Sequence, residues 1–500
     1  IGSIDLNSLY PSVIRALNMG PETIVGQIRP VITSAEINRA KHAKKSFAAA
    51  WDNQFGSWEY QAVMEKEKGT ELIIDWTDGT SVRMSAAQLY DVVFEGNNKW
   101  MLSANGTIFT YEFEAIIPGL LKRWYAERKE MQRKMHESGS NEIEKEYWDK
   151  RQLVKKINLN SLYGAILNPG CRFFDMRIGQ SVTLTGRCIT KHMGAKVNEI
   201  ISGKYDHVGE GIIYGDTDSV YFSAHKTLAK DIESGQVPWT KESVIGLYDK
   251  IAEEVNTTFS GFMTKAFHCP TTRGSVIKAG RELVALKGLF ITKKRYALLY
   301  YDIEGNRVDS AGKEGKVKAM GLDLKRSDTP IFVQDFLSDI LYQVLTGESE
   351  KQVLQAISDF RSEFKARPGW EKGSPKRANN MTKYTDAEEK QGRANMPGHV
   401  RASMNWNNCK QMYSDKYSLP ITDGAKVIVC KLKNNPLNYT SIAYPVDELR
   451  IPDWFKELPF DSEAMEQTIL DQKLDNLIGV LDWDIQSTET SNTFNKLFEF

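Results

Sequence analysis

The spacing of hydrophobic residues along the chain predicts both short strands and long helices. An apolar run at residues 1–6 (IGSIDL) predicts a buried strand that ends at Asn7-Ser8, and a short helix follows it. "TELIIDWTDGTSVRM" predicts a hairpin with Asp78-Gly79 at its turn. "EGIIYGDTDSVYFSA" predicts a second hairpin, because β-forming residues flank a tight Gly-Asp-Thr-Asp turn. "GLFITKKRYALLYYDIEGNRV" predicts two further strands.

From about residue 111 the hydrophobic period becomes that of helices. "YEFEAIIPGLLKRWYAERKEMQRKMHE" predicts a long amphipathic helix, in which Pro118 marks either a kink or the true start. "EIEKEYWDKRQLVKKINLNSLYGAI" predicts a second helix with Asn141 as its N-cap, so the two would form an antiparallel hairpin. Residues 30–68 and the chain beyond about 320 also read as helical, and residues 367–400 read as a loop rich in Gly, Pro and Asn.

Composition adds a size and a compartment to this picture. A chain of 500 residues exceeds what one core supports, so we expect two to four domains of a soluble globular protein. No apolar run approaches the ~20 residues of a membrane span, which predicts no membrane association. The five cysteines have neither disulfide nor metal-site spacing, which predicts free thiols in the cytoplasm. They are Cys171, Cys188, Cys269, Cys409 and Cys430.

The net charge is zero, but the charges are unevenly distributed. The 65 basic residues balance the 65 acidic ones, which argues against a uniformly basic nucleic-acid-binding protein. Residues 122–156 nevertheless hold 11 Lys or Arg against 7 Asp or Glu. The predicted helical hairpin would therefore present a basic face.

Acidic residues at strand ends predict a metal site. Asp216 and Asp218 lie at the tip of the second hairpin, where two close carboxylates repel each other unless a divalent cation is present. A solvated Asp-rich turn is the alternative, and it is favoured for an isolated pair. Asp5 ends another apolar strand, and if the two strands are neighbours, three carboxylates meet at one sheet edge. That is the layout of a two-metal phosphoryl-transfer site.

Basic and aromatic residues on the helical hairpin suit a nucleotide. Lys156, Asn160 and Tyr163 have i, i+4, i+7 spacing and share one helix face. Arg128 on the facing helix adds a cation that can bind phosphate with two hydrogen bonds. A surface Lys, a capping Asn and a core Tyr are the alternative interpretation.

Two further segments have the character of binding surfaces. Lys293, Lys294 and Arg295 precede Tyr296 at a strand end, which suits a nucleic-acid backbone, although a solvated basic run is an equal alternative. The C-terminal "LFEF" puts three apolar side chains on an acidic end, which predicts a docking peptide for a groove on a partner. The alternative is that the tail packs on its own domain. These side chains are Leu497, Phe498 and Phe500.

Taken in order, these motifs resemble those of the family B (alpha-like) DNA polymerases, particularly the replicative polymerases of T-even-like tailed phages. "DLNSLYPS", "KKINLNSLYGA" and "YGDTDS" are similar to the family's three polymerase motifs, "TKKRYAL" to its Lys-Lys-Arg-Tyr element, and "LFEF" to the phage sliding-clamp tail. The resemblance implies an α+β right-hand architecture. The palm, with an antiparallel sheet, would be residues 1–114 and 169–317, the helical-hairpin fingers 115–168, and the mostly helical thumb 318–500.

The resemblance also implies roles in DNA synthesis from dNTPs on a primed template. Two divalent ions, Mg²⁺ or alternatively Mn²⁺, would be bound by Asp5, Asp218 and the Leu6 carbonyl, with Asp216 in support. Glu282 would be an auxiliary carboxylate near them. The nucleotide would contact Arg128, Lys156, Asn160, the amides near Ser8 and Leu9, the steric gate Tyr10, and Tyr163 and Gly164 beside the nascent base pair. The DNA backbone would contact Lys293, Lys294, Arg295 and Tyr296, and a sliding clamp would bind Leu497, Phe498 and Phe500.

The chain departs from the phage pattern at several points. Gln132 stands where the phage enzymes have a Lys, a role that Arg133 or Lys134 could take, and Gly280 stands where they have an Asp. The family's N-terminal and exonuclease domains have no counterpart ahead of Ile1, so we expect no proofreading from this chain and an upstream half that was removed or is a separate subunit. The expected location is the cytoplasm of an infected bacterial host.

Two other classes of protein compete with this interpretation. Metal-dependent glycosyltransferases also use an Asp-x-Asp turn, but they need neither Asp5 nor a basic helical hairpin. A non-catalytic fragment that binds DNA and a clamp is the second alternative, and the intact acids and second motif argue against it.

Overall fold

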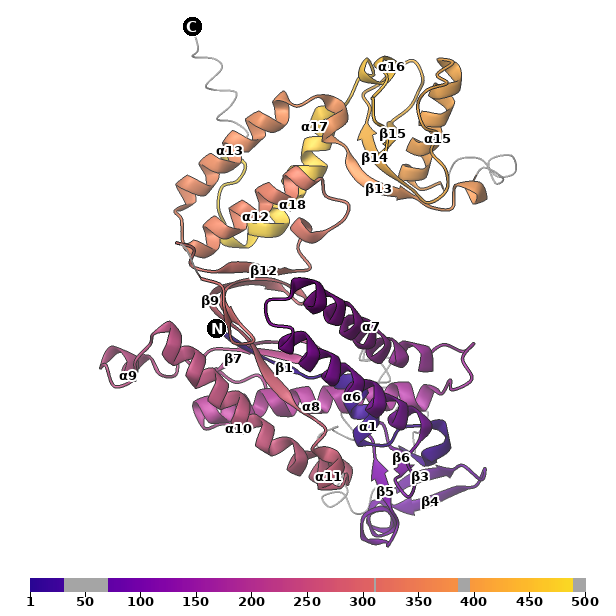
Figure 1. Ribbon diagram of the computed structural model, residues 1–500, viewed down its shortest axis with the longest axis vertical. Coiled ribbons are helices and arrows are strands. Elements are labelled where there is room, and N and C mark those ends of the chain that lie inside the picture. Colours follow the sequence, from indigo (N-terminus) through magenta and orange to yellow (C-terminus); the bar gives the residue numbers. More distant parts are fainter. Residues whose placement is uncertain (31–70, 310–311, 385–395, 489–500) are drawn as a thin grey trace. The chain divides into compact units, whose positions relative to one another are not determined.

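The computed structural model describes residues 1–30, 71–309, 312–384 and 396–488, which form a mixed α+β fold with antiparallel sheets (Figure 1). The chain divides into two compact units. Unit 1 comprises residues 1–284 and 303–305, and unit 2 comprises 285–302 and 306–500. Apart from Pro30, the helix expected over residues 30–68 lies outside the described residues.

The central sheet of unit 1 confirms the predicted opening strand and second hairpin. Its antiparallel strands have the order β9-β1-β8-β7. In this register Asp5 of β1 pairs with Ser219 of β8 on one side and with Gly280 of β9 on the other. The strands are β1 (Gly2–Leu6), β7 (Ile212–Gly215), β8 (Ser219–Phe222) and β9 (Ala279–Thr292), which continues into unit 2.

Two long helices, α8 (Met176–Ser202) and α10 (Lys241–Phe267), pack with this sheet. Thr240 caps α10 through a hydrogen bond from the Ser243 amide. The ring of Tyr248 on α10 lies 4.8 Å from that of Phe222 on β8. At Gly2 an added Cβ would lie 2.5 Å from Tyr248 Cδ2, so the close approach of helix and strand requires glycine.

A second antiparallel sheet in unit 1 has the order β4-β3-β2-β6-β5 and confirms the first predicted hairpin. Asp78 accepts a hydrogen bond from the Thr80 amide, and Gly79 has a φ of 88°, as a tight turn requires. Ile28, Ile74 and Ile108 lie in the hydrophobic core of this sheet. The strands are β2 (Ile24–Pro30), β3 (Glu71–Trp76), β4 (Ser81–Ser85), β5 (Trp100–Leu102) and β6 (Thr107–Thr110). The helix α5 (Ala86–Tyr90) and a π-helical turn (Asp91–Glu95) follow β4.

The predicted helical hairpin consists of α6 (Ile116–Glu137) and α7 (Glu142–Ile166), which lie side by side (Figure 1). Pro118 lies in the first turn of α6, so it marks the start of the helix, as a proline at this position favours. Asn141 is the predicted N-cap, and its side chain accepts a hydrogen bond from the Glu144 amide at 3.2 Å. The remaining helices of unit 1 are α1 (Leu9–Ala16), a 3₁₀ turn (Pro21–Thr23), α9 (Ala229–Glu233) and α11 (Thr271–Gly274).

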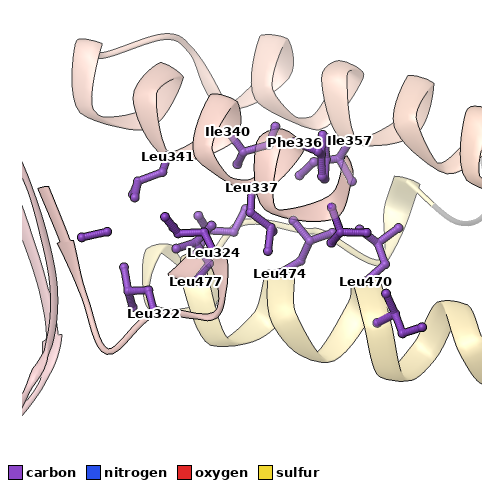
Figure 2. Packing of buried hydrophobic residues seen from close by; sticks show 14 of the residues in the cluster. Leu322, Leu324, Phe336, Leu337, Ile340, Leu341, Ile357, Leu470, Leu474 and Leu477 are labelled. Atoms are coloured by element: carbon purple, nitrogen blue, oxygen red, sulfur yellow. The ribbon is translucent and has the colours of Figure 1, made fainter. Parts of the chain in front are cut away.

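Unit 2 contains a helical core, which confirms the helices predicted beyond residue 320. Figure 2 shows Phe336, Leu337 and Ile340 of α12 packed with Leu470 and Leu474. The helices are α12 (Ile331–Thr346), α13 (Glu350–Ala366), α17 (Ser462–Glu466), a π-helical turn (Gln467–Asp471) and α18 (Gln472–Ile478). The strands beside them are β10 (Arg295–Ile303), whose last residue groups with unit 1, β11 (Asn306–Arg307) and β12 (Lys316–Met320). Short 3₁₀ turns span Asp323–Lys325, Gly369–Lys372 and Gly479–Leu481.

The loop expected at residues 367–400 is a wrong prediction, because β13 (Ser374–Ala378) lies within it. Its sequence, SPKRA, has no alternation of apolar and polar residues and includes a proline. The strand forms at a sheet edge, where it pairs with β14 (Ala425–Lys431) far along the chain. The same sheet includes β15 (Ser441–Pro445), and its separate core holds Trp406 of α15 (Gly398–Met412) and Phe455 of α16 (Asp453–Lys456).

Candidate active site

Strand pairing in unit 1 brings together two of the three predicted acids. The amide of Leu6 on β1 donates to the carbonyl of Asp218, just before β8, at 2.8 Å. The half-buried side chains of Asp5 and Asp218 line the same cavity, which has a volume of about 800 Å³. Because Asp5 pairs with Ser219, the next residue after Asp218, the two carboxylates come from adjacent strands.

Asp216 has a different place in the hairpin. Its carboxylate accepts a hydrogen bond from the Thr217 amide at 2.7 Å, and its own amide donates to the Ser219 carbonyl at 2.9 Å. The Thr217 carbonyl in turn accepts from the Thr190 hydroxyl of α8. Asp216 does not line the cavity, unlike Asp5 and Asp218. The hydrogen bonds given above are those of a turn residue.

The turn between β1 and α1 forms the floor of the cavity. Ser8 adopts a left-handed conformation with a φ of 48°, and the Ser12 hydroxyl donates to the Asn7 carbonyl at 3.0 Å. The chain therefore reverses sharply, and residues 7–10 all line the cavity. The first amides of a helix lack helical acceptors and attract anions, so the start of α1 is suited to a phosphate group.

Tyr10 and Tyr163 form the aromatic part of the site. Their ring centroids are 4.7 Å apart, and the Tyr163 hydroxyl donates to the Gly179 carbonyl at 3.4 Å. Burial raises the pKa of Tyr163, and the neighbouring Tyr10 adds to the shift. Gly186 of α8 packs closely against the start of α1, since an added Cβ would lie 3.2 Å from Leu9 Cδ2 and 3.4 Å from Tyr10 Cε1. At Gly164 an added Cβ would meet nothing within 4 Å.

The helical hairpin contributes cations to the cavity wall. Arg128, Lys156 and Asn160, all predicted from the sequence, line it. Arg128 is half-buried and donates from Nε to Gln152 of α7 at 3.2 Å. Burial lowers the pKa of Arg128, but a guanidinium remains charged at any physiological pH.

Lys129 and Glu304 line the same cavity and were missed by the sequence reasoning. Lys129 could have been found, because a helical period puts residues 125, 128, 129 and 132 on one face. Glu304 follows a strand whose pairing with β9 brings it back to Glu282, and its amide donates to the Glu282 carbonyl at 2.7 Å. The register of the two predicted strands about Lys293-Lys294 was the signal for this contact.

Gln132 and Gly280, the two residues that depart from the phage pattern, both line the cavity. Gln132 lines it, whereas the two candidates to replace it do not. Arg133 forms ion pairs with Glu130 and Glu137, and Lys134 lies 4.6 Å from the Trp148 ring centroid. Gly280 also lines the cavity, and an added Cβ would meet nothing within 4 Å. Glu282 lies on the cavity wall, where its carboxylate accepts a hydrogen bond from the Ser3 hydroxyl at 3.0 Å.

The oxygen ligands at the cavity suit a metal such as Mg²⁺ that takes part of its coordination shell from water and substrate. They do not suit a metal whose ligands all come from the protein. Within the described residues no group of three or more His, Cys, Asp or Glu side chains has a metal-binding arrangement. Asp5 and Asp218 offer hard oxygen donors at one cavity, next to the Leu6 peptide. Mg²⁺ characteristically takes one or two carboxylates and completes its shell with water and substrate phosphates. The residues present therefore fit ions that bind together with a nucleotide.

The predicted DNA-contacting segment lies in unit 2. Lys293 and Lys294 are exposed at the turn between β9 and β10, and Lys294 has a φ of 62°. Arg295 donates to the Asn476 carbonyl at 3.0 Å. Tyr296 is buried, with its ring stacked on that of Phe290. The exposed cations are thus at the turn, and the predicted clamp-binding residues 497–500 lie outside the described residues.

Unit 2 also has a cavity of about 690 Å³ whose wall carries more cations than acids. Lys473 is buried there and donates to the Thr329 hydroxyl at 2.8 Å. Lys376 pairs with Asp328 at 3.0 Å. The charged residues of the wall are Arg326, Lys376, Lys431, Lys473, Asp323 and Asp328, so cations outnumber acids.

The five cysteines are free, as predicted, and no helix in the described part of the chain combines the length and hydrophobicity that a membrane crossing needs.

Comparison with known proteins agrees with the family resemblance of the sequence motifs. The sequence model of the family described as "DNA polymerase family B" matches residues 1–367.

Among curated proteins, the DNA-directed DNA polymerase of Escherichia phage RB69 is 27% identical over 460 residues, which cover 89% of this chain and 49% of the relative. That of Enterobacteria phage T4 is 27% identical over 465 residues, with the same two coverages. The DNA polymerase delta catalytic subunit of Oryza sativa subsp. japonica is 26% identical over 253 residues, covering 50% of this chain and 20% of the relative. The chain thus spans about half the length of the two phage relatives.

Proposed function

The chain belongs to DNA polymerase family B, and on that premise we propose that it carries out template-directed DNA synthesis. The reaction would join a dNTP to a primer 3′-hydroxyl, with pyrophosphate as the leaving group. The observation that carries the proposal is the cavity of unit 1, where two carboxylates, two predicted cations and a helix start share one wall.

Asp5 and Asp218, together with the Leu6 carbonyl, would hold two divalent ions, Mg²⁺ or Mn²⁺. When bound, such ions lower the pKa of the attacking hydroxyl and neutralise charge on the leaving pyrophosphate. Asp5 is fixed for this task by hydrogen-bonded strands on both sides. Asp216 would support the site by shaping the turn that carries Asp218.

The incoming nucleotide would be held mainly through its phosphates. Arg128 can bind non-bridging oxygens with two hydrogen bonds, and Lys156 adds a second positive charge. Asn160 would supply a polar contact, and the amides near Ser8 and Leu9 would bind phosphate at the start of α1. These groups orient the α-phosphorus toward the primer and so reduce the entropic cost of the reaction.

Tyr10 would act as the steric gate. Its ring contacts that of Tyr163, which limits its movement. A ribose 2′-hydroxyl would clash with the Tyr10 ring, so deoxynucleotides would be preferred. Tyr163 and Gly164 would line the nascent base pair.

We also propose the domain roles that the sequence implied. Residues 1–114 and 169–317 would be the palm, 115–168 the fingers and 318–500 the thumb. The fingers would close Arg128 and Lys156 onto the triphosphate. In unit 2, Lys293 and Lys294 would contact phosphates of the primer–template, with Arg295 and Tyr296 supporting the turn.

The proposed partner beyond DNA and dNTP is a sliding clamp, bound by Leu497, Phe498 and Phe500. The phage relatives support a setting in an infected bacterial cell.

The alternatives from the sequence analysis have less support. A glycosyltransferase does not require the pairing of Asp5 next to Asp218 or cations from a helical hairpin at the same cavity. A non-catalytic fragment does not require acids and cations to share a cavity. A nucleotide-sugar transfer assay would detect the first alternative.

Primer extension by the purified chain with Mg²⁺ and dNTPs tests the proposal directly. Asp218→Asn should reduce the extension rate by at least ~10³-fold while primer–template binding survives, because the isosteric amide removes only the charge. Asp91→Asn, at an exposed position outside the cavity wall, is the matched control and should extend normally. Normal extension by Asp218→Asn would refute the metal-binding role.

A further inference from the structure

We propose that Lys129 is a further nucleotide-binding residue, which offers a third cation to the triphosphate in the cavity of unit 1. This inference rests on the proposed function, because it concerns a ligand contact at the same site. Lys129 lies outside the three sequence motifs that contain Asp5, Lys156 and Asp218.

The position of Lys129 on α6 directs it to the cavity. Tyr125, Arg128, Lys129 and Gln132 have i, i+3, i+4, i+7 spacing, and all four line the cavity wall. They make up one face of the helix, and Lys156 and Asn160 of α7 line the same cavity. Lys129 is exposed, so a ligand can reach its ammonium group without a change in the helix.

Tyr125, which also lines the cavity, is a neighbour of the Lys129 ammonium group. The Lys129 ammonium lies 5.8 Å from the Tyr125 ring centroid, near the outer limit of about 6 Å for a cation–π contact. The Arg15 guanidinium lies closer to the same ring, at 4.9 Å. A contact this long is weak, so a triphosphate can draw the ammonium away at low cost.

The other basic residues of α6 are engaged outside the cavity. Lys122 pairs with Glu114, and Arg123 pairs with Glu127. Arg133 and Lys134 contact acidic and aromatic residues of the hairpin, as described above. Of the six basic residues in this helix, only Arg128 and Lys129 line the cavity.

The balance of charges on the cavity wall also supports a role for Lys129, because a triphosphate bound there needs cations to offset the nearby carboxylates. Asp5, Asp218, Glu282 and Glu304 contribute four carboxylates. Arg281 is paired with Asp249 at 2.5 Å. Arg128, Lys129 and Lys156 are therefore the cations of the wall that can turn to a highly charged anion, and Gln132 adds no charge.

The test measures nucleotide affinity in variants of the full chain bound to primer–template. Titration with a non-hydrolysable dNTP analogue reports binding without chemistry, and single-nucleotide insertion separates KM from kcat. Lys129→Ala should weaken analogue binding and raise KM about tenfold, with kcat changed less than about threefold. Lys129→Arg, which keeps the charge, should stay within about threefold of wild type. Arg133→Ala, one helical turn away and outside the cavity wall, is the matched control.

A double variant guards against an indirect effect of the first. Gln132→Lys combined with Lys129→Ala should restore affinity, because it returns a cation to the same helix face. Unchanged analogue binding by Lys129→Ala would overturn the inference, as would equal losses in Lys129→Arg and Lys129→Ala. If the wild-type chain binds the analogue through Lys129 but extends no primer, the proposed function fails and the inference stands.

Discussion

The rings of Tyr10 and Tyr163 lie 4.7 Å apart, although 153 positions separate the two residues along the chain. One belongs to the first turn of α1 and the other to the last turns of α7. The contact joins the helix that follows the Asp5 strand to the helix that carries Lys156. The shape of the proposed sugar pocket would therefore depend on both helices.

Replacing the Tyr10 ring should relax sugar selection. Tyr10→Ala should raise the efficiency of ribonucleotide insertion relative to deoxynucleotide insertion by about 10²-fold, because the clash with the 2′-hydroxyl disappears. Tyr10→Phe keeps the ring and should retain the discrimination. The measurement is kcat/KM for matched rNTP and dNTP pairs, and an unchanged ratio in Tyr10→Ala would exclude the gate role.

Gly280→Asp should be tolerated and should change the dependence on Mg²⁺. An added Cβ meets nothing within 4 Å, so the free energy of unfolding should change by less than about 1 kcal/mol. The new carboxylate would stand opposite Asp5 and lower the Mg²⁺ concentration needed for half-maximal extension. Gly280→Asn is the uncharged control, and the same Mg²⁺ dependence in both variants would show that the carboxylate does not reach the site.

Gly2→Ala should destabilise the protein. The new methyl group would lie 2.5 Å from Tyr248 Cδ2 and 3.0 Å from Phe222 Cζ, and overpacking of this kind costs about 1–3 kcal/mol. Gly246→Ala is the contrasting control, since that glycine lies in the exposed interior of α10 with open space around it. It should stabilise the helix by about 0.5–1 kcal/mol. Urea unfolding gives both values, and similar effects of the two changes would contradict the packing argument.

Arg361→Met should strongly destabilise unit 2. The buried Arg361 guanidinium donates hydrogen bonds to Glu466 at 3.0 Å and Thr488 at 2.9 Å, and it forms an ion pair with Asp471 at 2.6 Å. Its removal would leave carboxylates without their cation, which costs about 3–5 kcal/mol. The exposed ion pairs of Arg133 provide the comparison, because Arg133→Met should cost less than about 1 kcal/mol. A small effect at both positions in urea unfolding would count against the buried network.

Stability should fall as the pH drops from 6.5 toward 4, because His192 is neutral in the folded protein. Burial lowers its pKa to about 4, and the nearby Lys196 adds to the shift. The unfolded chain takes up the proton near pH 6.5, so the stabilisation is complete above that pH and is lost below it, by up to about 3 kcal/mol. His192→Gln can keep hydrogen bonds to Tyr205 and Thr258 without titrating. Urea unfolding at several pH values should show a shallower slope for this variant, and equal slopes would contradict the assignment.

Local pattern was enough to predict much of unit 1. The Asp78-Gly79 turn and the cap at Asn141 follow from turn chemistry and helix capping. The sequence left open whether the Asp5 and Asp218 strands are neighbours, and the structure shows that they pair. The cavity residues Lys156 and Asn160 were predicted from their helical spacing, and Arg128 was predicted as a cation on the facing helix.

The remaining features depended on pairing that local pattern does not encode. β13 is polar and contains Pro375, so only its register with β14 makes it a strand. Asp216 and Asp218 are equivalent in the sequence, yet hydrogen bonding at the turn separates their positions. The burial of Tyr296 against Phe290 likewise depends on strands folded together.

The left-handed turn at Ser8 makes the separation of Asp5 and Tyr10 a molecular ruler. Tyr10 follows Asp5 by five positions along the chain. The turn at Ser8 fixes both the end of the strand that carries Asp5 and the start of the helix that carries Tyr10. A substitution at Asn7 alters one side chain. A deletion there would instead change the register between strand and helix, and so the position of the Asp5 carboxylate relative to the Tyr10 ring. In evolutionary terms, the length of this segment should be under stricter selection than the identity of the residues between its two ends.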